Sequence, residues 1–124
     1  EDSVLGLFSR KRKKIEVDFA AVDSPDKAEA LVARGALARV FLVPPQRGGF
    51  EGPMNSVYVT PEAAEEKMRC DAEVDELERR GQVSKYACDL EYDENGPSRV
   101  ARSITVQGKS QDDAVVCSRT VSVW

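Results

Sequence analysis

The last third of the chain contains the stretch that decides the fold, residues 86–123, which reads YACDLEYDENGPSRVARSITVQGKSQDDAVVCSRTVSV. Apolar and polar residues alternate in three separate runs of this stretch, and a period of two is typical of strands with one buried face. Asn95-Gly96 marks a turn after the first run, and residues 108–113 mark a turn after the second. The stretch therefore predicts three antiparallel strands.

Upstream of this stretch, the sequence predicts two helices and three further strands. Each helix begins with a hydroxyl residue followed by proline, at 24–25 and 60–61, and ends at a glycine. Strands are predicted at 15–19, 37–43 and 56–60. The expected fold class is α+β, with an antiparallel sheet, two helices on one face and the order β-α-β-β-α-β-β-β. Its first six elements match the split-βαβ, ferredoxin-like order, and two C-terminal strands extend that sheet.

Length and composition favour one folded domain. The chain has 124 residues, of which 41% are hydrophobic and 32% charged, so it is long enough for one core and too short for two. We divide it into a flexible basic N-terminal tail, residues 1–14, and a single α+β domain, residues 15–124. No apolar run is long enough to cross a bilayer. Three cysteines without paired spacing indicate reduced thiols and a cytoplasmic location.

Several classes of chemistry lack their usual residues in this sequence. Histidine is absent, which removes the commonest general base and the commonest zinc ligand. The glycine-rich phosphate-binding motifs are absent as well. We therefore expect no cofactor, no metal and no catalytic residue, and we lean towards a chain that is not an enzyme. A histidine-free, carboxylate-dependent enzyme is kept as an alternative.

The charge is unevenly distributed along the chain. Net charge is −4, but Arg10–Lys14 carries five positive charges, and the chain from Ile15 onward has thirteen basic and twenty acidic side chains. An acidic body repels nucleic acid and anionic membranes, so such binding would have to come from the tail or a local patch. The basic run could make that contact, or could be a solvated terminus. The carboxylates of the helix predicted after residue 61 are interpreted as a solvated face.

The first candidate site is the segment of residues 44–55, which is rich in proline and glycine. Joining two strands needs only two to five residues, so a connection this long is either functional or simply flexible. We predict that a protein partner binds its exposed side chains, namely Arg47, Phe50, Glu51 and Met54. In the alternative interpretation Phe50 folds back onto the core.

The second candidate site is a platform on the C-terminal strands. If the last two strands pair through a turn at 108–113, Arg102 lies opposite Arg119 on the apolar face. Two like charges in that position favour an anion between them, and Tyr86 and Tyr92 share the face. A phosphate, a carboxylate, a nucleotide or nucleic acid could bind there. The alternative is that both arginines reach water or pair with an acid.

The sequence thus predicts a small non-catalytic cytoplasmic module that binds a protein partner through residues 44–55. The first alternative is binding of an anion, nucleotide or nucleic acid by the arginine and tyrosine platform. The exposed end strand leaves a homodimer open, because an unpaired strand edge can pair with a second copy.

Overall fold

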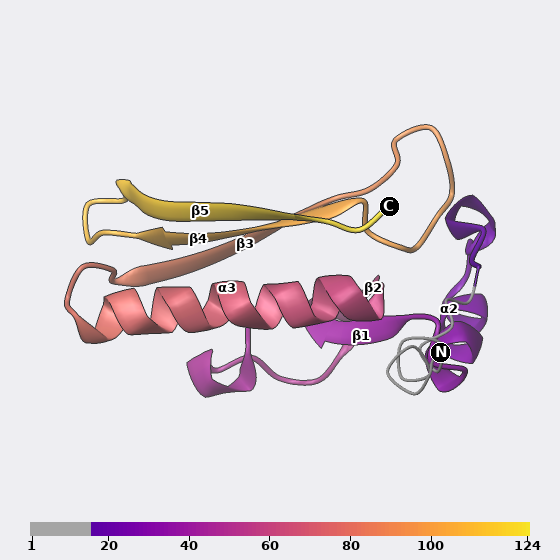
Figure 1. The fold of residues 1–124 in the computed structure, drawn as a ribbon, viewed down its shortest axis with the longest axis horizontal. Coiled ribbons are helices and arrows are strands. Elements are labelled where there is room, and N and C mark those ends of the chain that lie inside the picture. The colour runs from indigo at the N-terminus through magenta and orange to yellow at the C-terminus, as the bar shows by residue number, and fades with distance from the viewer. Residues whose placement is uncertain (1–15) are drawn as a thin grey trace, which may run out of the picture.

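The computed structural model describes residues 16–124, which form two α-helices and two antiparallel sheets (Figure 1). In chain order the elements are α2 (Pro25–Ala33), β1 (Ala38–Phe41), β2 (Ser56–Val59), α3 (Pro61–Arg79), β3 (Lys85–Glu91), β4 (Ser103–Lys109) and β5 (Val115–Ser122). The predicted α+β class is confirmed. The arrangement is compatible with a ferredoxin-like variant, although the order of elements differs from the predicted one.

The larger sheet has the strand order β3-β4-β5, with both pairings antiparallel. Because side chains alternate between the two faces of a strand, Ile104 and Val106 of β4 point to one face and are buried there. The opposite face is polar, and Thr105 Oγ1 lies 3.0 Å from Thr120 Oγ1 on β5. The alternation of buried and half-buried side chains in β4 matches the alternation of apolar and polar residues from which the strand was predicted.

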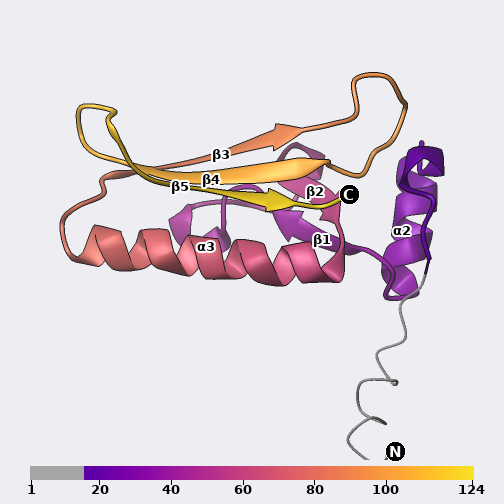
Figure 2. The same ribbon diagram turned by 45° about the horizontal axis from the view of Figure 1, so that its top comes forward.

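Helix α3 covers the apolar face of this sheet (Figure 2). Its N-terminus is capped by Thr60, whose Oγ1 accepts a hydrogen bond of 3.2 Å from the Ala63 N–H, and Pro61 occupies the first turn. Three residues spaced along one stripe of the helix, Ala63, Cys70 and Val74, are buried in the main core. The predicted cap is confirmed.

Strands β1 and β2 form the second sheet. Val40 pairs with Val57, and both belong to the core on which α3 packs. The second sheet is tied to the segment before β4 by an isolated parallel bridge between Tyr58 and Val100. The Ala101 N–H also donates a hydrogen bond of 3.1 Å to the Tyr58 carbonyl. Helix α3 therefore contacts strands of both sheets.

Helix α2 packs at one end of the molecule rather than on the face of the larger sheet (Figures 1 and 2). Its buried residue Ala28 belongs to a separate small core with Val22, Leu37 and Val100. The prediction of two helices on one face is therefore wrong, because only α3 covers the sheet. The reason is that α2 is short and has one fully buried residue, Ala28. The small core at the end of the molecule covers this residue, so α2 has no wide apolar face to pack on the larger sheet.

The predicted strand at 15–19 is also wrong over its described part, residues 16–19. Within residues 16–124 the segment pairs with no strand, and the chain enters a 3₁₀ turn at Phe19–Ala21, where the Ala21 N–H bonds to the Asp18 carbonyl at 3.0 Å. Phe19 instead stacks on Trp124, with ring centroids 5.5 Å apart. Phe19 is therefore half-buried through an aromatic contact and not through strand pairing. The alternation of half-buried and exposed residues over 16–19 is the same as in a strand, which explains the wrong prediction.

The register predicted for the last two strands is wrong by four residues. Val106 lies opposite Arg119 and Ile104 opposite Val121, whereas Val115 and Cys117 were the predicted partners. The turn lies further along the chain than predicted: residues 110–114 connect β4 to β5, and the Ser110 N–H bonds to the Ala114 carbonyl at 2.8 Å. Residues 108 and 109, assigned to the turn from sequence, belong to β4.

Some predictions concern features that the fold tests only in part. None of the helices within residues 16–124 is long and apolar enough to cross a membrane. The three cysteines, Cys70, Cys88 and Cys117, form no disulfide. The basic run Arg10–Lys14 and the predicted tail lie outside the described residues. The division into tail and domain and the cytoplasmic location stay predictions.

Candidate functional site

Residues 44–55, called the 44–55 loop below, form an ordered connection between β1 and β2. Two 3₁₀ turns, Pro45–Arg47 and Pro53–Asn55, occupy its ends. The buried side chain of Asn55 joins them: its Oδ1 accepts from the Val43 N–H at 2.9 Å, and its Nδ2 donates to the carbonyls of Val43 and Phe50, both at 3.0 Å. One buried amide thus satisfies backbone groups from both sides of the loop.

Two glycines allow this path. Gly48 has φ 92°, in the left-handed region that glycine adopts without a steric penalty. Gly49 passes so close to the start of the loop that a Cβ there would lie 1.8 Å from the Val43 carbonyl oxygen. Gly48 and Gly49 are therefore needed for the backbone conformation of the loop, because other residues would be strained at the first position and would clash at the second.

The loop presents two large apolar side chains to solvent. Phe50 is 70% exposed and Met54 is 86% exposed. The alternative in which Phe50 folds back onto the core is therefore wrong. Glu51, between them in sequence, is exposed as well. Three of the four residues predicted to meet a partner thus share the exposed part of one loop.

The fourth predicted residue, Arg47, is placed differently. Its guanidinium points at α3, where Nη2 donates to Asp75 Oδ1 at 2.6 Å and to Glu78 Oε1 at 2.7 Å, and only 13% of its side chain is exposed. It also lies over the ring of Tyr86, 4.9 Å from the centroid. Arg47 therefore anchors the loop to the helix instead of extending outward, because two carboxylates on α3 lie within its reach.

Beneath the loop, Lys67, Asp71 and Tyr86 form a buried polar cluster. Lys67 Nζ donates to Asp71 Oδ2 at 2.8 Å and to the Tyr86 hydroxyl at 3.2 Å. The single proton of that hydroxyl is donated to Asp71 Oδ1, its nearest acceptor at 2.6 Å. Lys67 is 3% exposed and Asp71 8%. The interpretation of the α3 carboxylates as a solvated face is therefore wrong for Asp71.

Two neutral groups of β3, the Tyr86 hydroxyl in this cluster and the Cys88 thiol, have raised pKa values. Burial, reinforced by the hydrogen bond to Asp71, raises the pKa of Tyr86 far above its ordinary value. Burial also raises the pKa of the Cys88 thiol on the same strand. Both groups stay protonated near neutral pH, so Tyr86 acts as a hydrogen-bond donor and Cys88 is a weak nucleophile.

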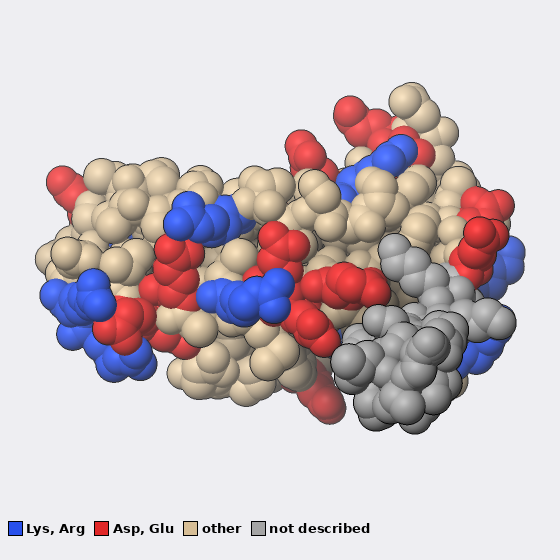
Figure 3. Space-filling view, viewed as in Figure 1, with Lys and Arg blue, Asp and Glu red and all other residues tan. Residues whose placement is uncertain are grey.

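The other carboxylates of α3 are exposed or half-buried. Figure 3 shows acidic and basic side chains interleaved over the face that contains this helix. Glu76 pairs with Arg80 at 3.1 Å, and Glu73 pairs with Arg119 of β5 at 2.9 Å. Such exposed pairs contribute little to stability and form no concentrated patch of one sign.

The structure does not bring the four residues of the predicted platform together. Arg102 lies over the Trp124 ring, 3.8 Å from its centroid, and donates to the Trp124 carbonyl at 3.0 Å. Arg119 pairs with Glu73 on α3, and Tyr86 belongs to the buried cluster. The geometric basis for placing an anion between the two arginines is therefore wrong, because it depended on the incorrect register. Tyr92 is 42% exposed.

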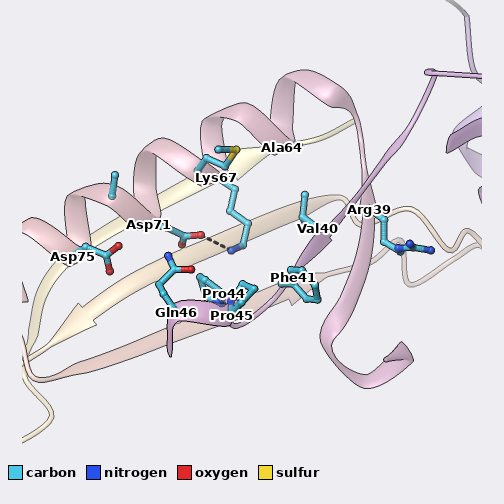
Figure 4. A pocket seen from close by; sticks show the side chains of 12 residues that line it. Arg39, Val40, Phe41, Pro44, Pro45, Gln46, Ala64, Lys67, Asp71 and Asp75 are labelled. Carbon is cyan, nitrogen blue, oxygen red and sulfur yellow. Dashed lines mark hydrogen bonds and ion pairs between the residues drawn. The ribbon is translucent and has the colours of Figure 1, made fainter. Parts of the chain in front are cut away.

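A groove of ≈ 360 Å³ lies between parts of β1 and α3 and ends at the 44–55 loop (Figure 4). Residues 39–41 and 44–46 line one wall. The other wall is a stripe of α3 that includes Ala64, Met68, Ala72 and Asp75, together with the buried Lys67–Asp71 pair. Sequence reasoning missed this groove. The signal was present in the α3 apolar stripe, since Lys67 falls four residues after Ala63 and so shares its buried face.

Comparison of the chain with protein-family models, with curated proteins and with solved structures found no match. The fold and the site therefore define the chain only as an α+β protein that combines an ordered apolar loop with a strand–helix groove. Any proposal about its function has to rest on the residues of this chain.

Proposed function

We propose that the chain is a protein-binding module whose partner contacts the 44–55 loop. The observation that carries the proposal is the exposure of Phe50 and Met54, 70% and 86%, on a loop with a defined backbone. Exposed aromatic and methionine side chains are enriched at protein interfaces, where they bury a large apolar area. Holding them on an ordered loop lowers the entropy that binding must remove.

The anchoring of the loop supports the same proposal. Asn55 and Gly49 fix the backbone of the loop and Arg47 Nη2 bonds it to α3, while the apolar side chains of Phe50 and Met54 remain outside the core. A loop that merely connected β1 and β2 would need neither a buried amide nor a buried guanidinium. The acidic balance of the chain after Ile15 favours a partner with a basic surface.

Affinity capture from native lysate, after nuclease treatment, tests this proposal. The double substitution F50S/M54S removes the apolar contact without touching the loop anchors. We expect a captured protein partner to be reduced at least about tenfold, since truncated interface anchors cost roughly 1–2 kcal/mol each.

A matched control is available on β5, where Val115 and Val116 are exposed, 54% and 43%, at a distant strand. The V115S/V116S chain should capture the partner as the native chain does. Equal loss in both variants, or no loss with F50S/M54S, would contradict a role for the loop.

A further inference from the structure

The edge of β1 that faces away from β2 carries backbone groups that pair with no backbone group among the described residues. In the described part of the chain β1 pairs with β2 alone. The Leu42 N–H donates to the Asn55 carbonyl at 3.0 Å, which assigns Leu42 to the side that bonds to β2. Because backbone groups alternate along an antiparallel strand, Arg39 and Phe41 direct their N–H and C=O groups to the opposite edge.

That edge borders the groove. Arg39, Val40 and Phe41 all line it, although their side chains point alternately to opposite faces of β1. No residue of β2 is among the described residues that line it, which places the groove on the side of β1 that faces away from β2. The unpaired backbone groups of β1 are therefore accessible from the groove.

The helical wall is shaped to leave room beside this edge. Ala64, Met68, Ala72 and Asp75 follow one another at intervals of three or four residues and so form one stripe of α3. The two alanines are small, and Met68 is 70% exposed beside them. A second chain in this space would meet apolar side chains on one side and strand-edge hydrogen-bonding groups on the other.

The charges of the groove are balanced except at its loop end. Lys67 is neutralised by Asp71, and Arg39 donates to Glu29 at 2.7 Å. At the loop end a single cation, Arg47, faces both Asp75 and Glu78, and these carboxylate-bearing side chains are 30% and 45% exposed. One negative charge is therefore left over, and it is accessible to a cation from outside.

We propose that this groove binds an extended segment of a partner protein, which adds a strand to the β1 edge and places a lysine or arginine beside Asp75 and Glu78. This inference rests on the proposed function and names its binding mode. Strand addition to an exposed sheet edge is a common form of peptide recognition, with main-chain hydrogen bonds for affinity and side-chain contacts for specificity. The four residues of β1 span about 13 Å, so about four residues of the segment pair with them.

A phage-displayed library of random dodecapeptides, selected on the 124-residue chain, tests this proposal. We expect the enriched sequences to combine alternating apolar residues with a lysine or arginine. A synthetic copy of an enriched peptide should bind the A72R variant at least about tenfold more weakly, because the longer side chain fills the groove. Arginine is a good helix former, so α3 should be retained. The A30R variant, on an exposed alanine of α2, is the matched control and should bind as the native chain does.

Two further measurements report on the mode of binding. Binding should slow amide hydrogen exchange at Arg39 and Phe41, whose N–H groups gain partners, and should leave Leu42 unchanged. The E78Q variant keeps Asp75 as a partner for Arg47 but removes the leftover charge. It should reduce the preference for a peptide lysine over glutamine by about two- to fivefold, the scale of an exposed ion pair.

Three results would overturn the proposal: no peptide enriched on the native chain relative to A72R, no exchange protection at Arg39 and Phe41, or self-association of the chain that A72R abolishes. The last result would assign the groove to a second copy. Failure of the groove is distinguishable from failure of the proposed function, because F50S/M54S alters the loop and leaves the groove wall on α3 intact.

Discussion

Replacing Lys67 with methionine is expected to lower the free energy of unfolding by about 3 kcal/mol. The substitution removes the ammonium group that donates to Asp71 and Tyr86, and it leaves the Asp71 carboxylate buried without a counter-ion. Methionine has a similar length and helix propensity, so packing and helix formation change little. Urea unfolding at neutral pH measures the effect.

The double variant K67M/D71L is the control for this prediction. Replacing both members of a buried ion pair with apolar residues is often neutral for stability, because no charge is left without a partner. We expect it to recover most of the loss. If K67M alone unfolds at the same urea concentration as the native chain, the Lys67 ammonium does not stabilise the buried Asp71 carboxylate.

Replacing Gly49 with alanine is expected to destabilise the chain by about 1–3 kcal/mol, the usual cost of forcing extra volume into a packed site. The new Cβ would lie 1.8 Å from the Val43 carbonyl oxygen and 2.9 Å from Asn55 Nδ2, and the first of these is rigid backbone. The loop must therefore move away from β1. Exchange of the Val43 amide, which donates to Asn55 Oδ1, should accelerate about tenfold or more.

Gly96 supplies the matched control for this second prediction. A Cβ at Gly96 would meet only the side chain of Asp93, at 3.0 Å, which can rotate away. The G96A variant should leave the Val43 amide exchange unchanged. If G49A also leaves that exchange unchanged, the 44–55 loop lacks the tight conformation on which the proposed function depends.

The helices and the C-terminal strands could be predicted because their signals are local. Ser24 and Thr60 cap helices whose next residue is a proline, and both caps are observed. Alternation along residues 103–109 matches a strand with one buried face, since every second residue of β4 is buried. These patterns depend on neighbours only a few residues away.

The strand register could not be predicted because Gly108 was assigned to a turn. In the structure it lies within β4, where a Cβ would approach Val83 Cγ2 at 2.9 Å and Cys117 Sγ at 3.0 Å. Its small size is required by a close approach between elements, which no local pattern reports. The four-residue error that followed also placed Arg102 opposite Arg119.

The candidate site was predicted in part. Exposure of Phe50, Glu51 and Met54 agrees with the prediction for the loop. The inward turn of Arg47 was missed, because its partners Asp75 and Glu78 are about thirty residues away in sequence. The groove was missed for the same reason, since its two walls come from separate elements.

Photo-crosslinking from the loop tests the central claim most directly. A benzophenone amino acid replaces Phe50 in one chain and Val116 in another, and each chain is irradiated in nuclease-treated native lysate. The proposed function predicts a protein adduct from position 50 that excess native chain abolishes, that excess F50S/M54S chain does not, and that position 116 does not form. Identical adducts from both positions, or none from position 50, would contradict it.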